Sequence, residues 1–347
     1  MRNREILRMG VVRAAGFGPK ASAGLLAGQG SDRLFYRLTE AGRSAVLMVS
    51  PPGDPDFKRY IEIGRFLYRK GLGAPEIYEA DPKGKSLVME DLGDETLYAF
   101  ARARKDKRSL AARYRKVVEL LVALQTRTRR SLPECPSAAR RTFDHRQLRW
   151  ETDYFRKNFL EADMGVEQSE AASLAGEFDA LARAVAKQPR RFMHRDFQSQ
   201  NILLKDGRVR LVDFQGSRRG GFAYDLASLL KDAYVDLPRS LRDRLLEYYR
   251  AELAAHGGPA LAKKDLERAL LLAGLQRNMQ ALGAFSFLSR VKGKRRFRRF
   301  IPLCLRHLRE GLAELNGGGI PPGPFPRLER VCAAVKPPAG GLSASRP

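Results

Sequence analysis

The chain has 347 residues, of which 64 are Lys or Arg and 39 are Asp or Glu, giving a formal net charge of +25. Hydrophobic residues make up 44% and charged residues 30%, a balance that excludes a wholly disordered or collagen-like chain. No uninterrupted apolar stretch approaches the roughly 18 residues of a membrane span, and no signal-peptide core follows the charged N-terminus. We therefore expect a cytoplasmic protein, and the charge fits either an anionic partner or a generally Arg-rich composition.

The N-terminal part has the pattern of a small lobe that mixes strands and one helix. Residues 34–38 and 45–49 are short apolar runs separated by a Gly-containing turn, which predicts an antiparallel pair. A Pro-rich break at 51–55 precedes apolar residues with helical spacing, which continue to about Gly71. Two further strands, joined by an Asp-Pro-Lys-Gly turn, complete the lobe before Asp91.

The pattern from Glu95 to about Leu315 is mainly helical, with amphipathic stretches between short loops. The exception is 203–212, where Asp-Gly between two alternating runs predicts a β-hairpin. After Asn316 the chain is rich in Gly and Pro, and we expect most of it to be weakly ordered. The predicted organisation is an N-lobe over 1–93, a C-lobe over 94–316 and a tail over 317–347.

One motif, over residues 194–213, has the residue types and spacing of a catalytic site. His194-Arg195-Asp196, an Asn at position 201 and, past the hairpin, Asp213 follow the order of a kinase catalytic loop. Phosphoryl transfer needs one carboxylate to orient and deprotonate the attacking hydroxyl, and further oxygen ligands that hold Mg²⁺ on the phosphates. We assign Asp196 as the catalytic base and Asn201 and Asp213 as the metal ligands. Turn capping is the alternative for any one of these residues, but their joint spacing argues against it.

With this motif, the chain resembles the aminoglycoside phosphotransferase and choline kinase branch of the kinase fold. Within that branch it is similar to the bacterial anomeric sugar kinases of cell-wall recycling, which phosphorylate N-acetylmuramate and N-acetylglucosamine at the C1 hydroxyl. Besides the catalytic loop, the resemblance is carried by residues 31–37, 48–52, 89–94, 213–215, 223–230 and 274–278. It implies a two-lobed, protein-kinase-like α+β fold with a small mixed β N-lobe and a larger, mainly helical C-lobe. It also implies ATP and Mg²⁺ as cofactors.

The resemblance implies roles in nucleotide binding as well. Gly28, Gly30 and Ser31 would form the loop over the phosphates, where small residues let backbone N–H groups approach. A lone Gly-x-Gly is otherwise a plain turn. Glu90 and Leu92 would offer backbone hydrogen bonds to adenine at the hinge between the lobes, and an ordinary strand end is the alternative there.

One departure concerns a cation. A protein kinase carries a phosphate-binding lysine on its third strand, and Met48 occupies that place here. Arg33 and Arg37 are the candidate replacements, because a guanidinium binds phosphate oxygens bidentately and strand alternation puts both on one face. Glu62, in the following helix, would hold one of these arginines or lie on the solvated surface.

A second departure is Gln215, which stands where a protein kinase has Gly, and no activation segment follows it. The acceptor is therefore expected to be a small molecule, and Gln215 would bind a sugar hydroxyl or only pin the loop. His194 and Arg195 are expected to support the catalytic loop. Asp225 would brace this loop from the next helix, or would cap that helix.

The acceptor pocket is expected in the helical lobe. Gln276, Arg277 and Asn278 form a polar cluster among apolar helical residues, and buried polar groups need partners. They would bind an acetamido group, or bridge two helices, and Arg277 suits the lactyl carboxylate of muramate. Trp150 and Tyr154, four residues apart, would stack on a sugar ring or pack in the core.

The predicted function is ATP-dependent phosphorylation of a sugar hydroxyl, with C1 of N-acetylmuramate or N-acetylglucosamine as the first choice. One alternative is a kinase of an amino alcohol or an aminoglycoside. The other is a nucleotide-binding scaffold that docks anionic partners through the basic run 292–299. Nucleic acid is not an expected partner, and the oligomeric state is left open.

Overall fold

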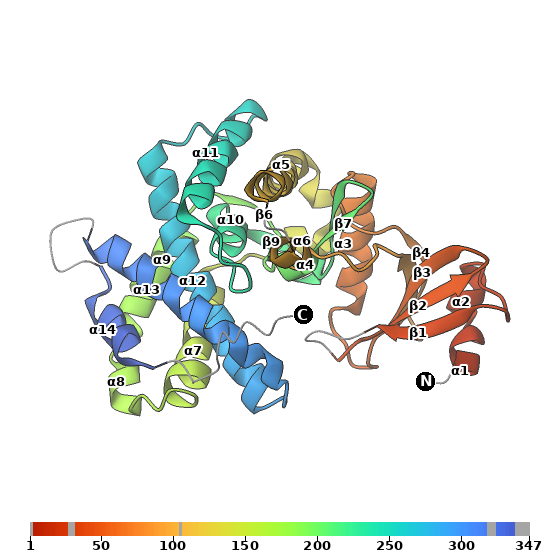
Figure 1. The fold of residues 1–347 in the computed structure, drawn as a ribbon, viewed down its shortest axis with the longest axis horizontal. Helices are drawn as coiled ribbons and strands as arrows, with labels where there is room; N and C mark the ends of the chain where they lie inside the picture. Colours follow the sequence, from red (N-terminus) through yellow and green to blue (C-terminus); the bar gives the residue numbers. More distant parts are fainter. Residues whose placement is uncertain (1–2, 27–31, 104–105, 318–323, 337–347) are drawn as a thin grey trace.

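The computed structural model describes residues 3–26, 32–103, 106–317 and 324–336 (Figure 1). Its N-terminal part is built on an antiparallel five-stranded sheet with the order β1-β2-β3-β5-β4. The strands are β1 (Ser22–Leu26), β2 (Leu34–Glu40), β3 (Arg43–Val49), β4 (Ile77–Asp81) and β5 (Ser86–Glu90). The predicted pair forms β2 and β3, whose turn uses positive φ angles at Ala41 and Gly42.

The two faces of this sheet pack against different partners, as alternation along β3 requires. Ala45 and Leu47 belong to the small core that includes α1 (Asn3–Leu7) and α2 (Gly10–Ala14). Val46 and Met48 point to the other face, into the core that contains α3 (Phe57–Arg69). Helix α3 confirms the helix predicted after the Pro-rich break, and it lies between the sheet and the helical part of the molecule (Figure 1).

The C-terminal part is mainly helical, and the expected division into a small β lobe and a larger helical lobe is confirmed. Its α-helices are α4 (Leu97–Ala103), α5 (Lys107–Ser131), α6 (Pro136–Ala139), α7 (His145–Phe155), α8 (Gln168–Ala172), α9 (Ala175–Ala186), α10 (Ala223–Leu230), α11 (Arg239–Ala255), α12 (Lys263–Arg290), α13 (Ile301–Gly317) and α14 (Pro326–Ala334). Helix α12 crosses this lobe between α10, α7 and α13 (Figure 1). Among the described helices, none has the length and apolar character that a membrane crossing requires.

Two small antiparallel sheets frame the segment that carries the kinase-like motif. β6 (Arg190–Met193) pairs with β9 (Arg218–Gly221), and β7 (Ile202–Lys205) pairs with β8 (Arg208–Leu211). The second pair is the predicted hairpin, with positive φ at both turn residues, Asp206 and Gly207. An Asp-Gly pair suits this turn because Gly, and to a lesser extent Asp, tolerates such angles. Both ends of the catalytic segment are therefore tied to a strand.

Part of the tail forms a helix that packs on the C-terminal lobe. Residues 326–334 form α14, which packs on α13 through buried apolar side chains that include Leu328 and Val331. The Glu177 carboxylate of α9 accepts hydrogen bonds from the backbone N–H groups of Arg327 and Leu328, both at 2.9 Å. Free N–H groups at a helix N-terminus need such partners. The prediction concerned most of the tail, and α14 is an ordered part of it that the prediction did not include.

Candidate active site

The loop after β6 is held by a buried carboxylate. Asp225 in α10 accepts hydrogen bonds from the backbone N–H groups of His194, at 2.6 Å, and Arg195, at 2.9 Å. Arg195 has a φ of 81°, a conformation that costs energy for a side chain with Cβ and persists where the surroundings impose it. Burial raises the pKa of the Asp225 carboxyl to about 7 although both N–H groups lower it. The N-cap of α10 is Phe222, so the contacts of Asp225 are those of a brace.

The three predicted catalytic residues lie together. The Asn201 side-chain amide donates to the Asp196 backbone carbonyl at 3.0 Å, and its Nδ2 lies 3.4 Å from Asp213 Oδ2. The Val212 N–H donates to the Asn201 carbonyl at 3.1 Å, which holds the two ends of the β7–β8 hairpin together. Asp213 follows in a left-handed conformation with φ 63°. One hairpin thus brings Asp196 and Asp213, which are 17 positions apart in the sequence, close together.

The Asp213 carboxylate has the character of a cation ligand. Burial and the neighbouring Asp196 charge raise the pKa of Asp213 to about 6, against the effect of a hydrogen bond from Gln215. A carboxylate withdrawn from water beside a like charge favours either a proton or a bound cation. Mg²⁺ takes oxygen ligands and commonly uses one or two protein side chains together with phosphate oxygens and water. Asp213 and the amide oxygen of Asn201 fit that donor set.

His194 supports the loop from within the core. Its ring is fully buried and makes an edge-on contact with Phe197 at a centroid distance of 5.9 Å. Burial lowers the pKa of His194 to about 4, so the ring is neutral at pH 7. A buried neutral imidazole is consistent with a packing role rather than with proton transfer.

This pKa predicts a stability change in acid. As the pH falls from 6.5 to 4, His194 takes up a proton in the unfolded chain but not in the folded one, so the free energy of unfolding decreases. We expect His194→Phe, which keeps an aromatic ring, to reduce the loss of unfolding free energy between pH 7 and pH 4.5 by about 2 kcal/mol. Urea unfolding of both proteins at the two pH values measures this difference. An equal loss in both proteins would contradict the assignment.

Arg33, which directly precedes β2, lies near the catalytic residues. Its guanidinium donates to both carboxylate oxygens of Asp54, at 2.8 and 3.3 Å, and lies 5.7 Å from the centre of the Tyr60 ring. It also lies close enough to Asp213 for its positive charge to lower the pKa of that carboxyl, against the larger effects of burial and Asp196. Met48, at the lysine position, is fully buried on the same face of the sheet. Arg33 therefore places a positive charge near Asp213, on the side of the sheet where Met48 is buried.

Glu62 does not hold either arginine. Its carboxylate accepts hydrogen bonds from the backbone N–H of Ser137, at 2.9 Å, and from the Ser137 hydroxyl, at 2.6 Å. These bonds tie α3 to the start of α6, so Glu62 supports the contact between the lobes. The prediction that it pairs with Arg33 or Arg37 is wrong.

Arg37 is engaged at the hinge. It donates to Asp91 at 2.7 and 3.0 Å and to Asp94 at 2.8 and 2.9 Å. Burial alone would raise the pKa of Asp91, but the hydrogen bonds from Arg37 keep it below its ordinary value. Arg37 thus connects β2 to the segment between the lobes, and its described contacts are with carboxylates rather than an open phosphate site.

The predicted adenine-binding segment is tied down on both sides. The Glu90 carboxylate pairs with Arg210 of β8 and lies 3.5 Å from the Lys205 ammonium of β7. The Glu90 N–H donates to the Glu76 carbonyl at 2.8 Å, so this donor is already used. Leu92 is buried just beyond it. Gly28, Gly30 and Ser31 of the predicted phosphate loop lie outside the described residues.

The predicted acceptor residues divide into two groups. Gln276 donates to the Leu148 carbonyl at 2.9 Å, and Asn278 donates to the Lys231 carbonyl at 3.2 Å. Both are fully buried and bridge helices, which is the alternative that the sequence left open. Gln215 likewise turns its amide to Asp213 Oδ1 at 2.7 Å, which pins the loop.

Arg277 differs from its neighbours because it reaches the catalytic loop. Its Nη2 lies 3.5 Å from Asp196 Oδ1 and donates to Gln198 Oε1 at 2.5 Å, while Nη1 donates to Gln280. The side chain is only 6% exposed. A charge-assisted contact in such a site is stronger than one in water. Helix α12 therefore places the buried guanidinium of Arg277 next to Asp196, the predicted base.

Sequence reasoning missed Glu151. This carboxylate is 1% exposed, accepts a hydrogen bond from Tyr224 at 2.9 Å, and lies 3.4 Å from Arg195 Nη2. It anchors the arginine of the catalytic motif to α7. The signal was present, since Glu151 lies among the buried residues Leu148 and Phe155 on the apolar face of an amphipathic helix.

The basic run 292–299 is joined to the fold. Lys292 Nζ lies 3.6 Å from Asp32 of the N-terminal lobe, and Arg298 lies 3.2 Å from the buried Asp163. Phe297, within the run, is itself buried. Two basic residues of the run therefore have acidic partners within the chain.

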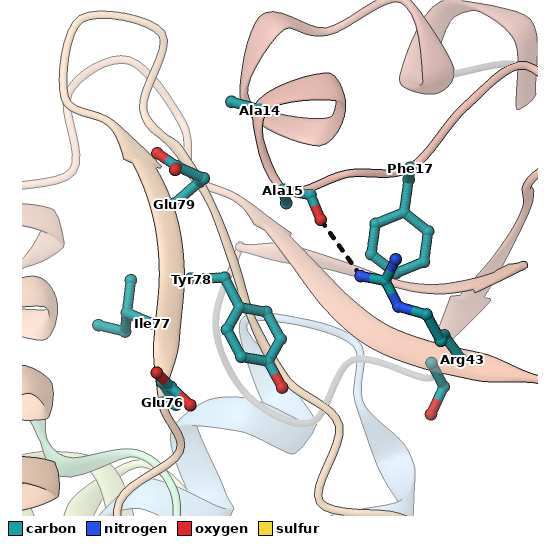
Figure 2. A pocket seen from close by; sticks show the side chains of 9 residues that line it. Ala14, Ala15, Phe17, Arg43, Glu76, Ile77, Tyr78 and Glu79 are labelled. Atoms are coloured by element: carbon teal, nitrogen blue, oxygen red, sulfur yellow. Dashed lines mark hydrogen bonds between the residues drawn. The ribbon is translucent and has the colours of Figure 1, made fainter.

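A cavity of about 480 Å³ lies on the N-terminal lobe, between α2 and strands β3 and β4. Figure 2 shows Glu76 and Tyr78 on one side of it and Phe17 with Arg43 on the other. The Arg43 guanidinium lies 5.1 Å from the centre of the Phe17 ring. None of the predicted catalytic residues lines this cavity, so the chemistry is assigned to the loop and hairpin that carry Asp196 and Asp213.

Related sequences cover most of this chain. The N-acetylmuramate/N-acetylglucosamine kinase of Pseudomonas aeruginosa is 29% identical over 308 residues, which cover 86% of this chain and 87% of the relative. The protein of the same name from Neisseria meningitidis serogroup B is 27% identical over 282 residues, which cover 80% and 81%. These relatives therefore span most of both lobes.

Solved structures show the same fold. A choline/ethanolamine kinase family protein from Mesorhizobium loti superposes with a TM-score of 0.62 at 14% identity, over 95% of this chain and 97% of the other. ADP-bound aminoglycoside phosphotransferase APH(2'')-Ib gives 0.55 at 17% identity, over 84% and 94%. The expected kinase-like fold is confirmed. The profile of the phosphotransferase enzyme family matches residues 23–262, which confirms the prediction of a phosphotransferase: the chain belongs to this family.

Proposed function

We propose that this protein phosphorylates the anomeric hydroxyl of N-acetylmuramate and N-acetylglucosamine, with ATP as the donor and Mg²⁺ as the metal. The observation that carries the chemistry is the convergence of Asp196, Asn201 and Asp213, joined by hydrogen bonds at 3.0 and 3.4 Å. The choice of acceptor is supported by the names of the relatives in Pseudomonas and Neisseria. ADP-bound and AMP-bound relatives of the fold support the use of a nucleotide.

In this proposal each residue has one task. Asp196 orients the sugar hydroxyl and takes its proton while the oxygen forms a bond to the terminal phosphorus and ADP leaves. Asn201 and Asp213 hold Mg²⁺, which neutralises charge on the phosphate oxygens when bound. Asp225 keeps the loop in place through its bonds to His194 and Arg195.

Arg33 completes the phosphate site as the replacement for the missing lysine. It is already oriented by Asp54, and a held guanidinium loses less entropy when it binds an anion. Arg37 has its charge shared between two carboxylates. The proposal therefore assigns the phosphate contact to Arg33 and leaves Arg37 at the hinge.

We further propose an N-lobe over 1–93 and a C-lobe over 94–316, with α14 added to the latter. The connection between the lobes follows β5, where residues 91–96 lead into α4. A cytoplasmic location accords with the use of ATP and stays part of the proposal.

Arg277 is proposed as a positioning residue for Asp196. We expect Arg277→Gln to lower kcat about 10- to 100-fold with both sugars, because the Asp196 carboxylate loses the cation that holds it at 3.5 Å. Arg277→Lys is expected to restore part of kcat, and KM for either sugar should change by less than about threefold. Steady-state kinetics with each sugar test this. An increase in KM confined to N-acetylmuramate would instead assign Arg277 to the lactyl carboxylate.

The function is tested by ADP release from ATP and Mg²⁺ with five acceptors offered separately: N-acetylmuramate, N-acetylglucosamine, glucose, choline and kanamycin. We expect turnover with the two N-acetyl sugars, and a product whose phosphate is at C1 by ³¹P NMR. Turnover confined to choline or kanamycin would keep the phosphotransferase and overturn the acceptor. ATP binding without turnover of any acceptor would favour the scaffold alternative.

A further inference from the structure

An exposed aromatic pair lies on α7. Trp150, the only tryptophan of the chain, is 55% exposed, and its ring stacks on Tyr154 with centroids 5.1 Å apart and planes 13° apart. A large aromatic side chain is normally buried because its area contributes strongly to core packing. The core alternative that the sequence left open is therefore wrong for Trp150, and the exposed ring needs another explanation.

The pair lies close to the predicted base. Gln147, one turn before Trp150 on the same face of α7, accepts a hydrogen bond from Arg218 at 2.9 Å. Arg218 in turn donates to the Gly216 carbonyl at 2.8 Å, and a Cβ at Gly216 would lie 3.6 Å from Asp196 Oδ2. The loop that flanks the base thus contacts α7 about one helical turn, or about 5.4 Å, from Trp150.

Helix α12 approaches the same face. Arg277 lies beside Asp196, and Gln280 is one turn further along α12. At Gly283 the two helices approach so closely that a Cβ would lie 2.9 Å from the Tyr154 ring, and Phe287 contacts that ring at a centroid distance of 6.0 Å. Tyr154 of the aromatic pair therefore packs against α12 about one turn beyond Gln280.

We propose that the Trp150–Tyr154 pair is the platform on which the pyranose ring of the acceptor rests. A sugar ring has an apolar face of C–H groups and an edge of hydroxyl groups, so it needs an aromatic surface beside hydrogen-bonding side chains. Trp150 provides the surface, Gln280 lies on its polar side, and Asp196 lies where the reacting hydroxyl would be. This inference rests on the proposed function, since it assumes a sugar acceptor.

The single tryptophan provides a direct binding assay. Full-length wild-type protein, without nucleotide, is titrated with N-acetylglucosamine while the Trp150 emission is recorded. We expect a saturable change in intensity or emission maximum, because a stacked sugar removes water from the indole. Sorbitol, an open-chain polyol without a ring face, serves as the control and should give no saturable change. A flat titration with the sugar, together with normal turnover of it, overturns the inference.

Kinetics of variants give a second readout. We expect Trp150→Ala to raise KM for the sugar about ten-fold, with kcat changed by less than about twofold and KM for ATP unchanged. Trp150→Phe, which keeps a ring, should retain most of the sugar affinity. Tyr68→Ala is the matched control, because Tyr68 is a 42% exposed aromatic residue on α3, outside the site.

The two possible failures are distinguishable. An unchanged KM for the sugar in Trp150→Ala, with an active wild type, overturns the platform and leaves the proposed function intact. Wild-type protein that phosphorylates neither N-acetyl sugar overturns the proposed function, and this inference with it.

Discussion

The Asp196→Asn variant is expected to lose about 10³- to 10⁴-fold in kcat, because it removes the group that accepts the proton of the attacking hydroxyl. The amide has nearly the same shape as the carboxylate, so it leaves the fold of the loop intact. The loop is fixed by backbone bonds to Asp225 at 2.6 and 2.9 Å, and these do not involve the Asp196 side chain. Binding of ATP, measured by calorimetry, should therefore change by less than about threefold.

A matched control for this variant is available ten residues away. Asp206→Asn makes the same chemical change in the β7–β8 turn, where φ is 49°. Asn-Gly suits this turn as well as Asp-Gly does, so activity and stability should stay at the wild-type level. A kcat of Asp196→Asn within ten-fold of wild type would show that another group takes the proton.

The second large effect is expected at Asp213. Asp213→Asn should lower kcat about 10³-fold or more and raise the Mg²⁺ concentration needed for half-maximal rate, because a neutral amide is a weaker ligand for a hard cation than a carboxylate. The left-handed φ of 63° is tolerated by Asn, and the amide oxygen can still accept the hydrogen bond that Gln215 gives to the carboxylate. A titration of rate against Mg²⁺ measures both changes.

The same substitution should make the metal-free protein more stable. Burial and the Asp196 charge raise the folded pKa of Asp213 to about 6, so its contribution to stability is present at low pH and is lost as the pH rises through 6. At pH 8 the charged group is therefore unfavourable, and Asp213→Asn is expected to increase the unfolding free energy by about 1–3 kcal/mol. Lower stability at pH 8 together with lost activity would point to a structural role instead.

The catalytic segment could be predicted because its geometry is local. Asp196, Asn201 and Asp213 lie within 18 consecutive residues, and the hairpin between them has an unambiguous turn signal at Asp206-Gly207. Local rules for turns and strand pairing are enough to bring the ends together. The two lobes followed similarly from strand alternation and helical periodicity.

Long-range ion pairs could not be predicted in the same way. The chain has 39 acidic residues that could pair with Arg37. The actual partners, Asp91 and Asp94, lie more than fifty positions away in the sequence. The hydrogen bond between Ser137 and Glu62 spans 75 positions, so it could not be predicted either. Periodicity indicates which face of an element a side chain occupies, but it does not indicate what packs there.

The tail contains a helix that the sequence analysis did not predict. Phe325, Leu328, Val331 and Cys332 have the spacing of a buried helical face. The segments around this helix are rich in Gly and Pro. The prediction followed that composition rather than the helical periodicity of nine residues. At residues 276–278 the polarity of three neighbouring side chains predicted an acceptor-binding site. Of the three, only Arg277 contacts the catalytic loop.

The charged contacts at the hinge determine how the lobes can move. Glu90 is held by Arg210 of the C-terminal lobe, and Asp91 is held by Arg37 of β2. A connection fixed on both sides acts as a pivot, so relative motion of the lobes is smallest there and grows with distance from it. The Asp32–Lys292 pair lies about five residues along the chain from Arg37, or about 16 Å in extended backbone. It joins the two lobes at a second point, and because both side chains are exposed this ion pair contributes only about 0–1 kcal/mol to holding them together.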